Sequence, residues 1–456
     1  MINKLIKFFE NKNILILGYG REGKSTYNFL RKHFPTMPLT IADLNEELAS
    51  DSVLKEDKNL KFILGKTYLD KLNDYDIIMK APGVSFKDVD VEKIRDKIES
   101  QQELMLRFFE VRTIGVTGTK GKSTTSSLIY QMLLDQGKKV AFLGNIGIPA
   151  FDHIDEIKKH QFIVFEFSSH QLEFMKHSPN IGIFLNIFEE HLDHYNSYEE
   201  YINAKCQVFR NQKKSDRYIY NCDSEIIRNK NEEFKVPSKK FAITYNNYTN
   251  IKVSENIINI SDGFVKYNGK KLYDVNSERQ LIGEHYLNDI MFVLTVAKIL
   301  HLDLTKAAKT IADFKGLHHR LENIGTYDEV TYYNDSISTI PESCESAITA
   351  LKNVGSLLIG GMDRGINYEG LVEFLNTGVV KNIICMPTSG HKIADELTNK
   401  DIKVYKVEDL KEAVETAKKV TPKGSICLLS PAAASYGYFK NFEERGEKFE
   451  EYVKES

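Results

Sequence analysis

The sequence predicts an α/β protein of three domains. Its 456 residues exceed the roughly 100–200 residues that usually fold around one core. Short apolar runs alternate with helix-like segments in the first and last parts of the chain, which is typical of parallel sheets covered by helices. A glycine turn near residue 118, between a strand-like run and a helix-like segment, predicts a nucleotide loop. We therefore expect an N-terminal Rossmann-like domain, a central P-loop domain with a small β-rich excursion, and a C-terminal Rossmann-like domain, bounded at 1–106, 107–316 and 317–456.

Composition argues against several kinds of partner. The chain carries 61 basic and 64 acidic side chains, a formal net charge of −3, so it has no surplus of positive charge for nucleic acid. Its five cysteines form no C-x-x-C pair, which favours reduced thiols in a cytosol. No apolar run could cross a bilayer, and the first residues lack a signal-peptide core. We expect a cytoplasmic protein whose partners are small molecules, without nucleic acid or membrane insertion.

The first domain is expected to open with a buried strand that ends in glycine. Apolar runs predict strands at 13–18, 39–42, 62–64 and 77–79, with a helix at 25–34. In this setting Gly18-x-Gly20-x-x-Gly23 is typical of a dinucleotide-type turn, and Asp43 ends the second strand, where a carboxylate can accept hydrogen bonds from a nucleoside. Ala81-Pro82-Gly83 follows the fourth strand and either closes over the same ligand or is an ordinary loop.

Two loops match a phosphate-binding pattern, so either of them could be the ATP site. Gly18–Ser25 meets the strict spacing G-x-x-x-x-G-K-S, whereas Gly118–Ser123 has only two residues between its glycines. Only the later loop is followed by an acid within a buried strand. That acid, Glu166, interrupts the run F-I-V-F-E-F, where an unpaired carboxylate would be costly. We therefore place ATP at the later loop and interpret the lysine and serine of the earlier one as the start of a solvated helix.

The later loop, Val116–Thr125, has the groups that polyphosphate binding requires. Its backbone N–H groups and the N-terminus of the following helix can bind phosphate oxygens, while Lys122 adds positive charge and the Ser123 hydroxyl can ligate Mg²⁺. Glu166 is then either a second Mg²⁺ ligand or the partner of a buried cation. The run E-E-H-L-D-H at 189–194 favours Mg²⁺ over zinc, because it has no neighbouring thiol and no helical H-E-x-x-H.

The rest of the chain contains fewer chemical signals. Residues 238–280 predict the β-rich excursion, and helices are expected at 284–302 and 305–314. In the third domain we expect strands at 331–334, 356–360, 382–386 and 425–429, with helices at 341–351, 368–375 and 409–419. Polar loops follow three of these strands, at Asn334–Ser336, Gly360–Gly365 and Ser430–Ser435. Because open α/β sheets bind ligands at the carboxyl ends of their strands, the three loops together indicate a site.

Eight motifs, taken in order, resemble those of one family. They are T-G-T-K-G-K-S-T-T, G-N-I-G, E-F-S-S-H-Q-L, E-H-L-D-H, G-L-H-H-R-L-E, N-D-S, G-G-M-D-R-G and L-S-P-A-A-A-S-Y-G-Y-F-K-N-F-E-E-R-G-E-K-F. Spread over nearly the whole chain, they resemble the Mur ligases of peptidoglycan synthesis, and the last two resemble the members that add glutamate. The motifs are too long for their agreement to arise by chance.

The resemblance implies a substrate for each domain. A UDP-sugar would bind through Gly18, Tyr19, Gly20, Arg21, Asp43, Pro82, Gly83 and Asn145, so the earlier glycine loop would be a UDP site. ATP would bind through Gly118, Thr119, Lys120, Gly121, Lys122, Ser123, Thr124 and Asn288, together with Arg320 and Asp335 of the third domain. Glutamate would contact Thr339, Arg364, Ser435 and Phe442.

The resemblance also implies the catalytic set, which is Lys122, Glu166, His191 and Lys205. Ser123, Glu166 and His191 would hold Mg²⁺, expected as two ions, and Lys205 would be carbamylated and supply a further anionic ligand. From the residues alone, Lys205 predicts only a solvated lysine on a polar helix face.

The implied activity is an ADP-forming amide ligation. Glutamate, expected as the D-enantiomer, would be added to UDP-N-acetylmuramoyl-L-alanine through an acyl phosphate, by a monomeric enzyme. Departures from the family leave L-glutamate open: Ile337 and Gly437 replace a usual lysine and aspartate, so a cation is missing unless Lys440 supplies it. His285–Asp289 also differs from the usual adenine-side pattern, which leaves the adenine contact open.

One further alternative comes from the same superfamily, and two come from other classes. A folylpolyglutamate-synthetase-like ligase shares the loop but should lack the N-terminal nucleotide domain. An NAD-dependent dehydrogenase would explain Gly18–Asp43 and nothing after residue 110. A non-catalytic nucleotide switch would have no need of Glu166, His191 and Lys205 together.

Overall fold

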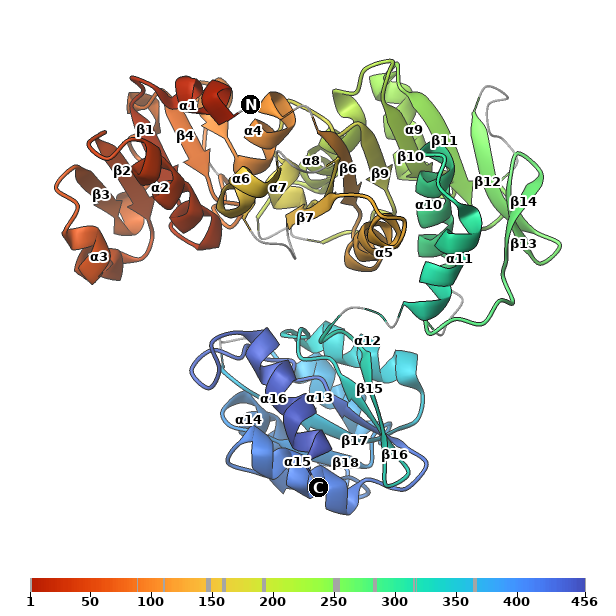
Figure 1. Ribbon diagram of the computed structural model, residues 1–456. Helices are drawn as coiled ribbons and strands as arrows, with labels where there is room; N and C mark the ends of the chain where they lie inside the picture. The colour runs from red at the N-terminus through yellow and green to blue at the C-terminus, as the bar shows by residue number, and fades with distance from the viewer. Residues whose placement is uncertain are drawn as a thin grey trace. The chain divides into compact units, whose positions relative to one another are not determined.

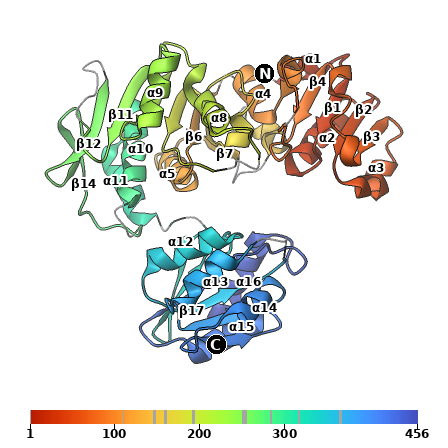
Figure 2. The same ribbon diagram turned by 180° about the vertical axis from the view of Figure 1, so that it is seen from behind.

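The computed structural model describes residues 2–455 apart from 88, 110, 145–148, 158–160, 191–193, 249–254, 282–284, 315, 317 and 364–366. It forms two compact units, Met1–Phe314 and Lys315–Ser456 (Figure 1; the reverse view is Figure 2). The α/β class is confirmed, since strands and helices alternate through both units. None of the described helices is long and apolar enough to traverse a lipid bilayer.

The first unit begins with a parallel sheet, which the described residues form from five strands in the order β3-β2-β1-β4-β5. These are β1 Ile14–Leu17, β2 Leu39–Asp43, β3 Leu60–Leu64, β4 Ile77–Lys80 and β5 Ile98–Glu99, with helices α1 Ile2–Phe9, α2 Arg21–His33, α3 Ser52–Lys55 and α4 Gln101–Phe108. Every residue of β1 is buried, as in a strand covered on both faces. Helix α2 begins at Arg21, four residues before the expected start, because Gly20 is its N-cap.

A second sheet of the same unit has nine strands within the described ranges, in the order β14-β13-β12-β11-β10-β9-β6-β8-β7. Its strands are β6 Arg112–Thr117, β7 Val140–Gly144, β8 Phe162–Glu166, β9 Ile181–Phe184, β10 Arg217–Asn221, β11 Lys239–Thr244, β12 Asn256–Ser261, β13 Phe264–Tyr267 and β14 Lys270–Asp274. The pairs β12–β13 and β13–β14 are antiparallel. The expected β-rich excursion is therefore the antiparallel edge of the central sheet.

Two apolar layers cover the second sheet. Its helices are α5 Lys122–Asp135, α6 Ile154–Ile157, α7 Ser169–Leu172, α8 Tyr198–Arg210, α9 Glu225–Phe234, α10 His285–Ile299 and α11 Leu304–Asp313. Helices α5, α10 and α11 pack together on one face, around Val116 and Ile129 (Figure 1). On the other face Phe165 and Tyr201 belong to an apolar cluster that continues to Ile16 of the first sheet. One core thus joins both sheets of the first unit.

The second unit contains a sheet in the order β15-β16-β20-β17-β18-β19. The strands are β15 Glu322–Tyr327, β16 Val330–Asn334, β17 Val354–Ile359, β18 Asn382–Cys385, β19 Lys403–Lys406 and β20 Ile426–Leu429; the helices are α12 Pro341–Leu351, α13 Glu369–Asn376, α14 Ser389–Glu396, α15 Leu410–Val420 and α16 Phe442–Lys454. Only β15 runs antiparallel to its neighbour among the described pairs. Leu357 and Leu358 of β17 belong to opposite apolar layers, so helices cover both faces of this sheet.

Candidate functional site

The glycine loop between β6 and α5 is held from two sides. Gly121 is the N-cap of α5 with φ +81°, and a Cβ there would lie 2.6 Å from Oδ1 of Asp289 in α10. Asp289 Oδ1 also accepts a hydrogen bond from the Thr125 hydroxyl at 3.1 Å. On the other side, the backbone N–H groups of Thr119 and Lys120 donate to Oδ1 of Asn186, at 3.0 and 2.9 Å. The loop is thus fixed before any ligand arrives.

Two lysines meet at this loop. Lys122 Nζ donates to the carbonyl oxygens of Gly118 and Thr119 at 2.9 and 2.8 Å. Lys205 Nζ, from α8, donates to the same Gly118 oxygen at 2.8 Å, and its side chain is 2% exposed. Burial lowers the pKa of Lys205 well below its usual value, and the positive charge of Lys122 lowers it further. The carboxylates of Glu190 and Glu166 act on the Lys205 pKa in the opposite direction.

Glu166 is the last residue of β8 and is fully buried. Ser123 is also buried, whereas Lys122 and Thr124 are half-buried and Lys120 is exposed. Hydroxyl and carboxylate oxygens of this kind suit Mg²⁺, while an ammonium group does not. Lys205 fits a metal site only if its nitrogen carries a carboxylate. His191, expected to complete the set, lies outside the described residues.

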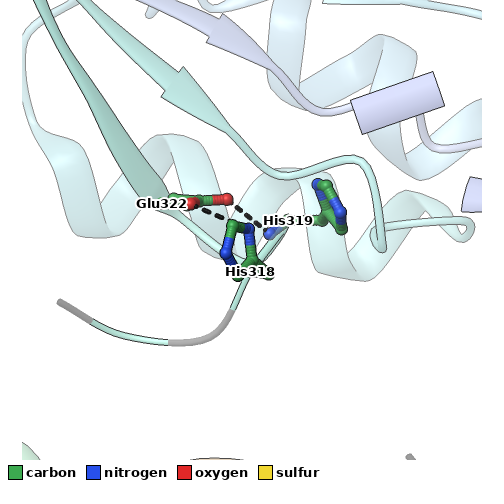
Figure 3. Close-up of side chains that lie close together, drawn as sticks. All are labelled: His318, His319 and Glu322. Atoms are coloured by element: carbon green, nitrogen blue, oxygen red, sulfur yellow. Dashed lines mark hydrogen bonds and ion pairs between the residues drawn. The ribbon is translucent and has the colours of Figure 1, made fainter. Parts of the chain in front are cut away.

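Three side chains of the motif G-L-H-H-R-L-E have possible metal-ligand atoms within 4.8 Å of one another. Among the residues that can be described, His318, His319 and Glu322 are the group whose ligand atoms come that close (Figure 3). His318 Nδ1 lies 3.1 Å from a Glu322 oxygen, and the His319 backbone N–H donates to the other at 2.8 Å. The His319 ring instead meets the amide of Asn334, at 2.9 Å. These contacts shape the loop before Arg320.

A cavity of about 470 Å³ opens at the carboxyl ends of the first sheet. It is lined by residues expected to hold the UDP-sugar, namely Gly18, Gly20, Arg21, Asp43, Pro82 and Gly83, together with Glu22, Leu44, Tyr68, Ala81, Val84, Gly144, Pro149 and Gln171. Asn145 lies outside the described residues, although its neighbour Gly144 lines the cavity. The glycine turn and Asp43 thus border one cavity of the first unit, and its ligand stays a prediction.

Backbone geometry explains the glycine turn of this cavity. Gly18 has φ +86°, and a Cβ there would meet Val84 and Ala81 at 2.8 and 2.9 Å. A Cβ at Gly23 would overlap the carbonyl oxygen of Gly18. The Tyr19 N–H donates to Asp43 Oδ2 at 2.6 Å, so the acid at the end of β2 stabilises the turn. The Asp43 carboxylate therefore has a structural partner in the protein itself.

Glu22 is a residue of this cavity that the sequence analysis did not identify. Its Oε1 accepts hydrogen bonds from Gln102 and Gln171 at 2.8 and 2.9 Å. Burial raises the pKa of Glu22, and these two amide donors oppose the rise. The carboxylate links α2 to α4 and α7, which carries part of the motif E-F-S-S-H-Q-L. No local pattern distinguishes Glu22 from a solvated residue of a helix start.

The second unit joins two of its polar strand ends at Asp335, namely Asn334–Ser336 and Ser430–Ser435. Asp335 is 2% exposed and accepts from the Ser430 hydroxyl at 2.7 Å and from the Leu321 N–H at 3.2 Å. Burial raises its pKa to about 6, although these hydrogen bonds and the charge of Arg320 oppose the rise. Arg320 is exposed, and its neighbours His319 and Leu321 have φ values of +62° and +44°.

Arg445 holds the same loops together. Its Nε and Nη2 donate to the hydroxyl and carbonyl oxygens of Ser336 at 3.0 and 2.8 Å, and its Nη1 donates to the Ala433 carbonyl at 3.0 Å. The Phe442 carbonyl accepts from the Ser336 hydroxyl at 2.8 Å. Burial lowers the pKa of Arg445 to about 9. Arg445 was not among the predicted site residues, although its place in the motif F-E-E-R-G was a signal.

The remaining expected glutamate contacts are only partly described. Ser435 is buried and lines a cavity of about 270 Å³, and Thr339 and Phe442 are half-buried. Arg364 lies outside the described residues. Asn288 is half-buried in α10, beside Asp289, whose contacts with the glycine loop the sequence analysis did not foresee.

Family models match parts of both units of the chain. The family model of the Mur ligase middle domain matches residues 116–297, and that of the Mur ligase, glutamate ligase domain matches 319–433. The UDP-N-acetylmuramoylalanine–D-glutamate ligase of Clostridium acetobutylicum is 34% identical over 465 residues, which cover 99% of this chain and 98% of the relative. The ligase of the same name from Acetivibrio thermocellus is 31% identical over 469 residues, with the same coverage of both chains.

Solved structures with lower identity share the fold. The UDP-N-acetylmuramate-alanine ligase MurC of Thermotoga maritima has a TM-score of 0.57 at 19% identity, covering 97% of this chain and 99% of its own. MurF of the same organism, solved with ADP, has a TM-score of 0.55 at 16% identity, covering 97% and 96%. FolC of E. coli, solved with DHPP and ADP, has a TM-score of 0.54 at 14% identity, covering 77% and 90%.

Proposed function

Because the chain belongs to the Mur ligase family, we propose that it joins D-glutamate to UDP-N-acetylmuramoyl-L-alanine at the expense of ATP. The observation that carries this proposal is the full-length match to relatives of that name. The cavity beside Gly18 and Asp43 supports a sugar-nucleotide substrate. The glycine loop with Lys122 supports ATP as the second substrate. The reaction would belong to peptidoglycan precursor synthesis in the cytoplasm.

The chemistry requires an activated carboxylate. A carboxylate and an ammonium do not condense at neutral pH, because the carboxylate is a poor electrophile and its oxygen a poor leaving group. In the proposed reaction the terminal phosphoryl group of ATP passes to the carboxylate of the alanyl residue, which gives ADP and an acyl phosphate. The glutamate amine then attacks the acyl carbon, the C–O bond to phosphate breaks, and the amine loses a proton. Amide and inorganic phosphate result.

Lys122 is the residue that we propose to bind the transferring phosphoryl group. The loop's N–H groups and the N-terminus of α5 provide further positive potential for phosphate oxygens. Mg²⁺, proposed as two ions on Ser123, Glu166, His191 and carbamylated Lys205, would offset negative charge between the phosphates and the carboxylate. Arg320 and Asp335 are proposed as ATP contacts, and Thr339, Arg364, Ser435 and Phe442 as glutamate contacts.

The environment of Lys205 supports its proposed carbamylation. Only a neutral amine attacks CO₂; the new N–C bond forms as the nitrogen loses a proton, and the product is an anionic carbamate. Burial and the neighbouring Lys122 favour the neutral amine, because both lower the pKa of Lys205. An anion at this position would also remove the repulsion between the two lysines.

The alternative ligation with L-glutamate is kept, since Ile337 and Gly437 depart from the usual motifs. A folylpolyglutamate-synthetase-like ligase is the less favoured alternative, because it would not need the N-terminal cavity. We propose a monomer with domain boundaries near residues 107 and 317.

An assay of phosphate release tests the function. The protein is incubated with ATP, Mg²⁺, UDP-N-acetylmuramoyl-L-alanine and either enantiomer of glutamate. We expect phosphate release that requires both the sugar nucleotide and D-glutamate. Release with L-glutamate alone would support the alternative, and no substrate-dependent release with either enantiomer would refute the ligase. Lys122→Ala should abolish turnover, because the phosphoryl group loses its protein cation.

A further inference from the structure

Lys80 is a buried lysine and the last residue of β4. It directly precedes the turn Ala81–Val84, which lines the cavity of about 470 Å³. The Lys80 side chain is 3% exposed, and its Nζ lies 3.4 Å from Oε2 of Glu173. The rings of Phe86 and Phe174 pack edge to face beside this ammonium group, and each ring centroid lies 5.5 Å from Nζ. Burial lowers the pKa of Lys80, and the negative charge of Glu173 opposes this effect. The lysine therefore lies in an apolar pocket in contact with the Glu173 carboxylate, and the negative charge of Glu22 acts on it in the same direction.

The Glu173 carboxylate also holds a histidine. Glu173 Oε2 lies 3.2 Å from Nε2 of His194, whose side chain is 7% exposed. The His194 carbonyl oxygen accepts a hydrogen bond from the Ser85 hydroxyl at 2.8 Å. Lys80 and Ser85 belong to the first sheet's side of the unit, while Glu173 and His194 belong to the second sheet's side. Two contacts thus cross from one sheet region to the other.

These contacts enclose the turn Ala81–Val84 at both ends. Lys80 fixes its beginning and Ser85 its end, and all four residues between them line the cavity of about 470 Å³. The side chains of Ala81 and Val84 occupy the space beside Gly18, where a Cβ would be 2.9 and 2.8 Å from them. A shift of the turn would therefore change the width of the cavity at the glycine turn.

Among these contacts, the ion pair of Glu173 with Lys80 should contribute most to holding the turn in place. A buried ammonium without an opposite charge is costly, and removal of one partner of a buried pair leaves the other uncompensated. The Ser85 hydroxyl contributes an ordinary hydrogen bond, which is worth less. Loss of the Glu173 charge would leave Lys80 with the weaker effect of the Glu22 charge, and should therefore release Lys80 and with it the beginning of the turn.

We propose that Glu173 is a positioning residue which, through Lys80 and the His194–Ser85 contact, clamps the turn Ala81–Val84 in the shape that binds a sugar nucleotide. The identity of that ligand rests on the proposed function, whereas the clamp rests on the contacts alone. Glu173 does not touch the cavity, so its effect on binding acts through the turn.

The variants for the test are Glu173→Gln, which keeps the side-chain volume, and Ser85→Ala, which removes a single hydrogen bond. The matched control is Lys32→Met. Lys32 Nζ also bridges the two sheet regions, at 3.1 Å from Asp155, but both side chains are more than half exposed. It lies in α2, outside the lining of the cavity.

Three measurements are made on each full-length variant: hydrogen exchange of the backbone amides of residues 81 and 83–85, the Kd for UDP by calorimetry, and the KM values for the sugar nucleotide and ATP. We expect faster exchange in both Glu173→Gln and Ser85→Ala. In Glu173→Gln the Kd for UDP and the KM for the sugar nucleotide should each rise about tenfold, and in Ser85→Ala both should rise less. The KM for ATP should stay within about twofold, and the control should match the parent.

Unchanged exchange in Glu173→Gln would overturn the clamp. Faster exchange with unchanged Kd and KM would overturn its role in binding, and an equal rise in the KM for ATP would indicate general disruption instead. If the parent binds UDP but releases no phosphate with the sugar nucleotide, the proposed function fails while the UDP titration still decides the clamp. If the parent does not bind UDP, the ligand assignment fails and the exchange rates alone decide whether the turn is clamped.

Discussion

Nζ of Lys205 donates a hydrogen bond to the carbonyl oxygen of Gly118 at 2.8 Å, although the two residues are 87 positions apart. The same oxygen accepts from Lys122. Two lysines on one carbonyl repel each other, and in a buried place this favours the neutral form of one of them. The more buried amine is that of Lys205, whose pKa is lowered well below its usual value.

Lys205→Ala should reduce phosphate release by on the order of 100-fold, because an anionic ligand near the phosphates is lost. Short carboxylic acids such as formate or acetate should restore part of the activity, since they can supply a carboxylate in the vacated space. Turnover is measured with and without acid at constant ionic strength. Lys230→Ala is the control, because Lys230 is also buried but pairs with Glu199 and Glu233 in another part of the unit. Absence of rescue would argue against the carbamate.

Gly121→Ala should weaken ATP binding specifically. The residue has φ +81°, which costs a non-glycine residue about 1–2 kcal/mol, and its Cβ would lie 2.6 Å from Asp289. Gly137 provides the control, since it follows the other end of α5 with φ +70° and its Cβ would meet no atom of the described residues within 4 Å. Both variants should lose similar stability from backbone strain. Only Gly121→Ala should raise the KM for ATP, and an equal rise in Gly137→Ala would refute a local effect on the loop.

The pKa of Asp335 makes the second unit sensitive to pH. Its value of about 6 in the folded chain is above the ordinary 3.8, so the folded state holds the proton more tightly. The resulting stabilisation is complete below about pH 4 and is lost as the pH rises through 6, with a total of about 3 kcal/mol. Hydrogen exchange of β16 amides, measured from pH 4 to 7 and corrected for intrinsic rates, reports this change.

Asp335→Asn should remove this pH dependence, because an amide does not titrate in the range. Ser430→Ala should move the loss of stability to higher pH, since the Ser430 hydroxyl donates to the carboxylate and opposes the rise of its pKa. The same slope in Asp335→Asn and in the parent would mean that another group titrates.

Local patterns predicted the parts of the fold that depend on the backbone. The run before Gly18 is a buried strand, and Gly18 and Gly23 are needed because the turn leaves no room for a Cβ. The region 238–280 was recognised as β-rich from its residue types. That these strands form the antiparallel edge of the central sheet was not predicted, because the pairing of strands far apart in the chain cannot be recognised from a short stretch of sequence.

Contacts between side chains that are far apart in the sequence were not predicted. Arg445 meets Ser336 across 109 positions, and Asp289 meets Thr125 across 164. Neither contact has a local signature, since each needs the folded sheet to bring two helices or loops together. The expected roles of Asn145, His191 and Arg364 stay predictions, because these residues lie outside the described ranges.

Gly446→Ala should destabilise the second unit by about 1–3 kcal/mol, the usual cost of overpacking. Gly446 lies in α16, and a Cβ there would overlap the ring of His319. His319 itself has a left-handed backbone conformation and directly precedes Arg320. The control is Gly370→Ala in α13. Among the described residues its Cβ would meet a single carboxylate oxygen, at 4.0 Å, so the change should raise stability by up to about 1 kcal/mol. Opening free energies from hydrogen exchange of β16 amides compare the two variants. If Gly446→Ala gave the same protection as the parent, the His319 ring would have room to move, and the close packing of α16 on the loop before Arg320 would not be what fixes that loop.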